Sequence, residues 1–229
     1  MNIKIDEILR TKRRTITLQI TSDGRLVIHA PLKTPRSLIE RAVQQKSGWV
    51  LQKQNEISLK NQKYPPKRCV EGEAFRIFGD DYSLTYSDTA KEVFAKGGKL
   101  FVPERFRDNA RVYIEKFYKS EAKRVLFERV AYYSAMYKIK YESVKITSAL
   151  SRWGSCSSKG RLCFTWRLAM APVLMIDYVV VHELSHINHL DHSKAFWQRV
   201  GELMPDYTAR REWFRNNSFL LRKNFFEGD

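Results

Sequence analysis

Four of the five histidines in this 229-residue chain lie in one short stretch, VHELSHINHLDHS, residues 181–193. Histidine is the commonest metal ligand among the side chains. A scattered structural use of the residue would rarely place four within eleven positions. Two of them, His182 and His186, enclose Glu183 in an H-E-x-x-H pattern. The clustering predicts a metal centre.

The four-residue spacing indicates that His182 and His186 bind the same ion. On a helix, residues four apart lie on one face, so both imidazoles reach an ion at about 2.0–2.1 Å. Glu183 lies beside the pair, where its carboxylate reaches a water molecule without displacing a ligand. The run of valines at 179–181 makes the helix apolar, and unliganded imidazoles are costly there. We therefore expect one bound metal ion, with the Glu183 carboxylate close to a water molecule on that ion.

Spacing alone leaves two candidates for the third ligand, His189 and His192. A catalytic zinc usually has three protein ligands and one open position. On a continuous helix, His189 would lie about 10 Å along the axis from His182. His192 is the better choice if the helix ends and the chain turns back before Ser193, which is suited to cap the next helix. His189 would then contact substrate or an oxyanion, or simply lie partly exposed at the helix end.

Two carboxylates are weaker candidates for the same centre. Glu202 could be a third ligand, but in a helix over 193–204 it falls opposite Phe196 and Val200 and is expected to face solvent. Asp177 lies five residues before His182. It either supports a ligand through a hydrogen bond or lies on the helix surface.

The N-terminal part shows strand signals followed by helix signals. Residues 15–20 and 26–31 alternate as strands around Asp23-Gly24, which is typical of a hairpin turn. Pro35 then opens a helical stretch with a break near Gly48. Pro65-Pro66 cannot continue a helix. We therefore predict a basic N-terminal β/α segment, 1–68, and a metal-hydrolase domain, 69–229, with one continuous domain as the alternative.

The rest of the chain predicts an α+β fold. Four short segments separated by Gly and Asp residues predict a small antiparallel sheet, and residues 104–136 predict one long helix or two. Strands at 142–147 and 161–166 precede Pro172, which opens the histidine helix, and two helices follow. The four sheet segments are 75–78, 82–86, 92–95 and 99–103.

Charge and composition suggest where the protein works and what it contacts. The net charge is +16, and residues 1–68 hold 15 Lys and Arg against 5 Asp and Glu. This excess indicates either a nucleic-acid partner or only a solvated, self-repelling surface, and no recognised binding motif accompanies it. Neither a secretory signal nor a membrane span is evident, and the three cysteines form no disulfide framework. We expect a cytoplasmic protein without a membrane partner.

Three segments together resemble a known family. They are Arg152–Cys156, Ile176–His186 and Asp191–Ser193, the last followed by Phe196-Trp197. They look like the YgjP-like predicted metal-dependent hydrolases, which are grouped with zincin metallopeptidases and are related to SprT-type domains. The resemblance is specific over residues 151–197. His189 stands where the metzincin pattern has glycine, and Asp191 stands where the family usually has asparagine.

The resemblance implies a helical zincin-like domain, after N-terminal antiparallel strands and a small sheet, that cleaves peptide bonds. It also implies zinc on His182, His186 and His192, with Glu183 as general base. A peptide substrate could pair with an edge strand near residues 151–166. Arg152 could bind a substrate carboxylate or an oxyanion, or stack on Trp153 to shape the turn.

Two other functions are compatible with the residues. A metal-dependent hydrolase of nucleotides or other phosphoanhydrides would use the basic surface, but the chain lacks a phosphate-binding G-x-x-x-x-G-K-[ST] loop. A nucleic-acid-binding module with structural zinc would normally use four protein ligands and would leave Glu183 without a role. Peptide hydrolysis is the prediction, with a protein or peptide as substrate.

Overall fold

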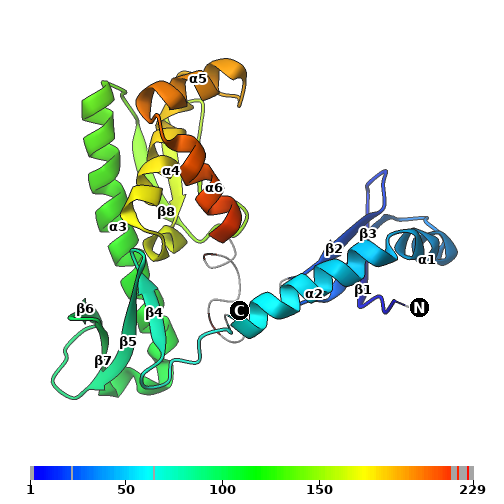
Figure 1. Ribbon diagram of the computed structural model, residues 1–229, viewed down its shortest axis with the longest axis horizontal. Coiled ribbons are helices and arrows are strands. Elements are labelled where there is room, and N and C mark those ends of the chain that lie inside the picture. The colour runs from blue at the N-terminus through cyan, green and yellow to red at the C-terminus, as the bar shows by residue number, and fades with distance from the viewer. Residues whose placement is uncertain (1–2, 22, 64, 218–220, 222–225, 227–229) are drawn as a thin grey trace. The chain divides into compact units, whose positions relative to one another are not determined.

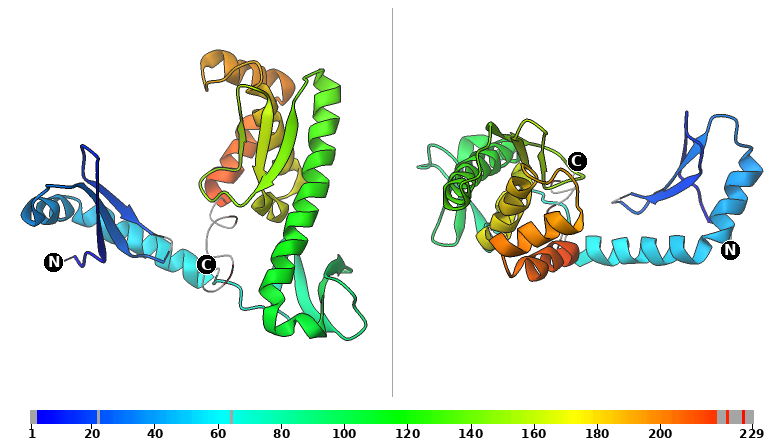
Figure 2. Two further views of the ribbon diagram at one scale, coloured as in Figure 1. Left: turned by 180° about the vertical axis from the view of Figure 1, so that it is seen from behind. Right: turned by 90° about the horizontal axis from the view of Figure 1, so that it is seen from above.

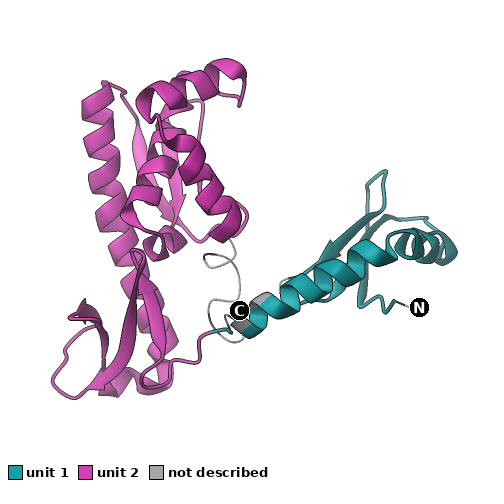
Figure 3. Ribbon diagram, viewed as in Figure 1, with its two compact units in different colours: residues 1–66 teal, residues 67–229 magenta. Residues whose placement is uncertain are grey.

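The computed structural model describes residues 3–21, 23–63, 65–217, 221 and 226. The chain divides into two compact units, residues 1–66 and 67–229 (Figure 3). Each unit has a hydrophobic core of its own. That the units are separate domains with a boundary at residue 68 stays a prediction.

The first unit is a three-stranded sheet covered by two helices. β3 is central, antiparallel to β2 and parallel to β1. The predicted hairpin is confirmed, with Gly24 at φ +88° in its turn. Alternating Leu26, Ile28 and Ala30 are fully buried against Ile39. The elements are β1 (Glu7–Thr11), β2 (Thr17–Ile20), β3 (Leu26–Pro31), α1 (Arg36–Gln45) and α2 (Ser47–Lys63).

The second unit begins with a four-stranded sheet in the order β4-β5-β7-β6. The prediction that this sheet is antiparallel is wrong, since β5 and β7 run parallel. Gly97 and Gly98, both at positive φ, join β6 to β7 in a hairpin. The more buried β7, with Leu100 and Val102, takes the inner place beside β5. The strands are β4 (Ala74–Ile77), β5 (Asp80–Ser87), β6 (Phe94–Lys96) and β7 (Lys99–Pro103).

A single long helix, α3 (Ala110–Tyr137), follows a short 3₁₀ segment, η1 (Glu104–Asn109). The stretch lacks Gly and Pro, which explains why it continues for 28 residues. Its apolar stripe includes Ile114, Tyr118, Ala122 and Val130, all buried. Figure 1 shows α3 running along unit 2, with the four-stranded sheet near one end and the histidine helix near the other. The helix is the scaffold that holds both.

The histidine helix, α4 (Val173–Ser185), covers one face of a second sheet, ordered β8-β10-β9. Pro172, which was expected to open this helix, is its N-cap residue, directly before the first helical residue Val173. Figure 2 shows the sheet from behind, with α4 on its far side. The predicted strands correspond to β8 (Ser143–Thr147) and β10 (Arg161–Thr165), and β9 (Gly154–Cys156) is an additional edge strand.

Three further elements complete the second unit. They are η2 (Trp166–Met170), α5 (Lys194–Leu203) and α6 (Tyr207–Asn217). The two helices expected after the histidines are therefore confirmed. The α+β fold class is confirmed as well. Within the described ranges, none of the helices is long and apolar enough to cross a membrane.

An ion pair fixes α4 to α3. Asp177, 2% exposed, accepts hydrogen bonds from Arg129 Nε at 2.5 Å and Nη2 at 2.9 Å. Asp177 is therefore neither a surface carboxylate nor a support for His182, and both expectations for it were wrong. The sequence pattern missed the pair because its two members are 48 residues apart.

Candidate metal centre

Three of the four clustered histidines converge where α4 ends. His182 lies in the last turn of α4, His186 is its C-cap residue, and His192 lies in the connection to α5. Their nearest ring nitrogens all lie within 4.8 Å of one another. His182 Nε2 and His192 Nε2 are 3.1 Å apart. The predicted ligands are thus together in space.

The chain folds back after α4 through local hydrogen bonds. The backbone N–H of His189 donates to the carbonyl of Ser185 at 3.1 Å. Asp191 Oδ1 accepts from the N–H of Ser193 at 3.1 Å, and Ser193 Oγ accepts from the N–H of Phe196 at 3.5 Å. The predicted cap by Ser193 is confirmed. This reversal is what brings His192 beside the end of α4.

Phe196 forms the floor of the histidine cluster. Its ring centroid lies 4.9 Å from those of His182 and His192 and 4.3 Å from that of His186. The side chain is fully buried, so it limits how far the three imidazoles can move. A residue of the hydrophobic core therefore also shapes the site.

A hydrogen bond to the backbone orients the imidazole ring of His186. His186 Nδ1 lies 2.9 Å from the backbone carbonyl oxygen of His189. Since a carbonyl only accepts, Nδ1 carries the proton and Nε2 keeps its lone pair. His189 thus contributes its backbone here, and its imidazole is outside the cluster. A contact between the His189 side chain and substrate stays a prediction.

The cluster has the ligand atoms and the spacing to hold one metal ion. Tetrahedral bonds of about 2.1 Å separate ligand nitrogens by about 3.4 Å, close to the spacing of the His182 and His192 nitrogens. Burial lowers the pKa of His182 to about 3, assisted by the charges of His186 and His192. His182 is therefore neutral at physiological pH and offers a lone pair to a metal. Its buried Nδ1 has no hydrogen-bond partner in the described part of the chain.

Glu183 lies next to the first ligand in a confined environment. The residue is 5% exposed. Burial raises the pKa of Glu183 to about 8, while the positive charge of Arg152 acts in the opposite direction. Arg152 is exposed, in the loop before β9. A carboxyl group whose pKa lies near neutrality is suited to take up and release a proton.

Glu183 makes the free energy of unfolding of the metal-free protein depend on pH. Between its ordinary pKa of 4.5 and its folded pKa of about 8, the unfolded chain loses the proton and the folded chain keeps it. The free energy of unfolding then falls as pH rises, by about 1.4 kcal/mol per pH unit. Glu183→Gln removes this loss. The contribution of His182 has the opposite sign but cancels in a comparison of the two proteins.

Urea unfolding in the presence of a chelator measures this difference. We expect the variant and the wild type to be equally stable below pH 4.5, and the variant to be clearly more stable above pH 8. A stability difference that stayed constant across this range would show that Glu183 is not desolvated in the folded chain.

Two other charged residues, Glu202 and Arg211, lie outside the H-E-x-x-H motif. Glu202 is exposed and accepts hydrogen bonds from Gln198 and Arg199, so it lies outside the histidine cluster, as expected. Arg211 on α6 was missed. Its guanidinium lies 4.4 Å from the ring centroid of Trp197, and its charge contributes to the lowered pKa of His182. It is remote from the motif in sequence, so no local pattern could have indicated it.

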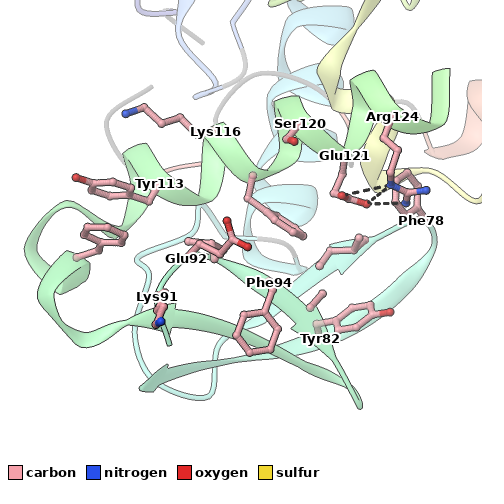
Figure 4. Close-up of a pocket in the computed structure, with 15 residues that line it drawn as sticks. Phe78, Tyr82, Lys91, Glu92, Phe94, Tyr113, Lys116, Ser120, Glu121 and Arg124 are labelled. Atoms are coloured by element: carbon pink, nitrogen blue, oxygen red, sulfur yellow. Dashed lines mark hydrogen bonds and ion pairs between the residues drawn. The ribbon is translucent and has the colours of Figure 1, made fainter. Parts of the chain in front are cut away.

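A cavity of about 740 Å³ lies apart from the histidines, between the four-stranded sheet and α3. Figure 4 shows aromatic rings such as Tyr82, Phe94 and Tyr113 around it, with the Glu121–Arg124 ion pair at one end. None of the three clustered histidines lines it. It contributes nothing to the metal centre.

A metallopeptidase family model agrees with the chemistry of the cluster. A family model described as YgjP-like, metallopeptidase domain, matches residues 14–217. A search of curated proteins finds no significant match. The crystal structure of the metallopeptidase zymogen of Pyrococcus abyssi abylysin is similar at 20% identity and a TM-score of 0.37, covering 42% of this chain and 96% of that one.

Proposed function

Because the chain belongs to the YgjP-like family of metallopeptidase domains, we propose that it is a zinc-dependent peptidase. His182, His186 and His192 hold one Zn²⁺ ion, and Glu183 is the general base. When bound, the ion supplies Lewis acidity, which makes water a nucleophile near neutral pH and polarises the peptide carbonyl. The transfer of the proton and the binding of the peptide are carried out by side chains and backbone groups of this chain.

The observation that supports this proposal best is the convergence of three imidazoles beside a buried carboxyl group. Among the described residues, the group of metal-ligating side chains has three members. Three protein ligands are typical of catalytic zinc, whereas structural sites are closed by four. His192 is exposed, so the histidine cluster is open to solvent on its side.

Glu183 moves the proton during the reaction. Its carboxylate accepts a proton from the attacking water and delivers it to the nitrogen of the leaving amine. The buried position keeps other water away from the carboxylate. Arg152, whose charge acts on Glu183, favours the ionised carboxylate that must accept this proton.

A peptide substrate binds along β9, the edge strand of the sheet under α4. At the two ends of the β9–β10 pair, the N–H of Thr165 donates to the carbonyl of Trp153 and the N–H of Ser157 donates to the carbonyl of Arg161. Bonded pairs alternate along an antiparallel ladder, so Gly154 and Cys156 direct their N–H and C=O groups to the open edge. An extended peptide pairs with these groups and thereby places a peptide bond beside the metal centre.

Turnover on a mixed panel of substrates tests the proposal. We expect the protein to cleave unfolded proteins and peptides, to stop after treatment with a zinc chelator, and to recover when Zn²⁺ is restored. Mass spectrometry of the products measures cleavage. Release of phosphate from nucleoside triphosphates without any peptide cleavage would instead favour a phosphoanhydride hydrolase.

Two finer expectations belong to the same proposal. The cytoplasm is the proposed location, and the basic N-terminal part is a proposed contact for nucleic acid in addition to the peptide substrate. Neither is required for peptide hydrolysis. Strongly salt-dependent nucleic-acid binding without turnover would favour the module with structural zinc.

A further inference from the structure

We infer that Gly154 positions the general base: its lack of a side chain creates the space in which the Glu183 carboxyl group lies between β9 and α4. The inference deepens the proposed function and rests on it for the catalytic role of Glu183. The proximity of the two residues is geometric, and it can be tested separately from activity.

The approach of the two residues is unusually close. A Cβ atom placed on Gly154 would lie 2.5 Å from Oε1 of Glu183, 2.6 Å from Cγ and 2.8 Å from Cδ. Ordinary van der Waals distances of a Cβ atom begin at about 3.4 Å. The end of the Glu183 side chain therefore occupies the volume that any side chain at position 154 would need.

Backbone conformation does not account for a glycine at this position. Gly97 and Gly98 have positive φ values and open space around them, so they serve a turn. Gly154 is absent from the residues with positive φ, and any L-residue can adopt its backbone conformation. The requirement for glycine at 154 is therefore one of space.

Packing on the other side of each element opposes a movement that would make room. β9 is paired with β10 through Gly154, Ser155 and Cys156, and the facing β10 residues Leu162 and Phe164 are fully buried. On the other side, Glu183 lies between buried residues of α4, which is held to α3 by the Asp177–Arg129 ion pair. The strain of an added side chain would fall on the Glu183 side chain.

The close approach links the base to the edge that binds substrate. The outward-facing N–H and C=O of Gly154 bond to the peptide main chain, while the face of Gly154 that would carry a side chain lies against Glu183. Gly154 thus fixes the position of the Glu183 carboxyl group relative to the bound peptide. A displacement of about 1 Å at a reacting group can cost about 100-fold in rate, so Gly154→Ala should act on kcat.

The first experiment measures kinetics of Gly154→Ala. We expect kcat to fall by about 100-fold, KM to change by less than about threefold, and the zinc content to stay equal to that of the wild type. Gly48→Ala is the matched control, since nothing lies within 4 Å of a Cβ there and its φ is not positive. That control should keep the wild-type kcat. A Gly154→Ala protein with wild-type kcat would overturn the inference.

The second experiment tests the close approach without any reference to activity. In metal-free protein, Gly154→Ala should lower the thermal unfolding midpoint in the wild-type background and have little effect in a Glu183→Ala background, where the space is vacant. An equal loss in both backgrounds would overturn the inference. If this coupling is found but the wild type cleaves no peptide, the positioning of Glu183 by Gly154 stands and the proposed function fails.

Discussion

Glu183→Gln is expected to lower kcat for peptide cleavage by about 10³-fold while the protein keeps its bound metal. The amide has nearly the same size as the carboxyl group, so it fits the same confined space against Gly154. It cannot accept a proton from water. The three imidazoles are untouched, and the metal content should therefore equal that of the wild type.

The control for this prediction is Glu202→Gln. Glu202 is exposed and accepts hydrogen bonds from Gln198 and Arg199, so the change should leave kcat unaltered. Initial rates on a peptide substrate, together with elemental analysis of each protein, measure both quantities. Full activity in the Glu183→Gln protein would mean that another group takes the proton.

His192→Ala is expected to weaken zinc binding by more than about 100-fold, because it removes one of three ligands, a larger change than the loss of a supporting hydrogen bond. Peptide cleavage should be lost with the metal. His192 is exposed, so the substitution removes little packing and the fold should remain. Competition with a chromophoric chelator measures the affinity.

His189→Ala is the matched control, since the same type of residue is removed three positions away. His189 contributes its backbone carbonyl to His186, and alanine retains that group. Zinc affinity should therefore stay within about threefold of the wild type, well below the loss expected for a ligand. A loss in His189→Ala as large as that in His192→Ala would assign the third ligand to the wrong residue.

Local patterns predicted those features of the site that depend on neighbours in sequence. The four-residue spacing placed His182 and His186 on one helix face, and Ser193 indicated where the next helix begins. Because the first helix must end before Ser193 begins the next one, the chain has to reverse between them. Such a reversal could bring His192 back beside His182 and His186. These inferences used only helix geometry and capping.

The remaining features depend on packing between distant segments. The Asp177–Arg129 pair and the stacking of Arg211 on Trp197 join residues whose own neighbourhoods look ordinary. The parallel pairing of β5 with β7 depends on which strand is buried in the middle of the sheet. The space beside Gly154 exists only because α4 packs on β9. None of these has a short-range signal.

Titration of metal-free wild-type protein with Zn²⁺, followed by calorimetry and elemental analysis, tests the central claim most directly. The three converging imidazoles predict tight binding of one ion per chain, and His182→Ala, His186→Ala and His192→Ala should each abolish the tight site. Protein that takes up no zinc, or that binds it equally well without these histidines, would contradict the account.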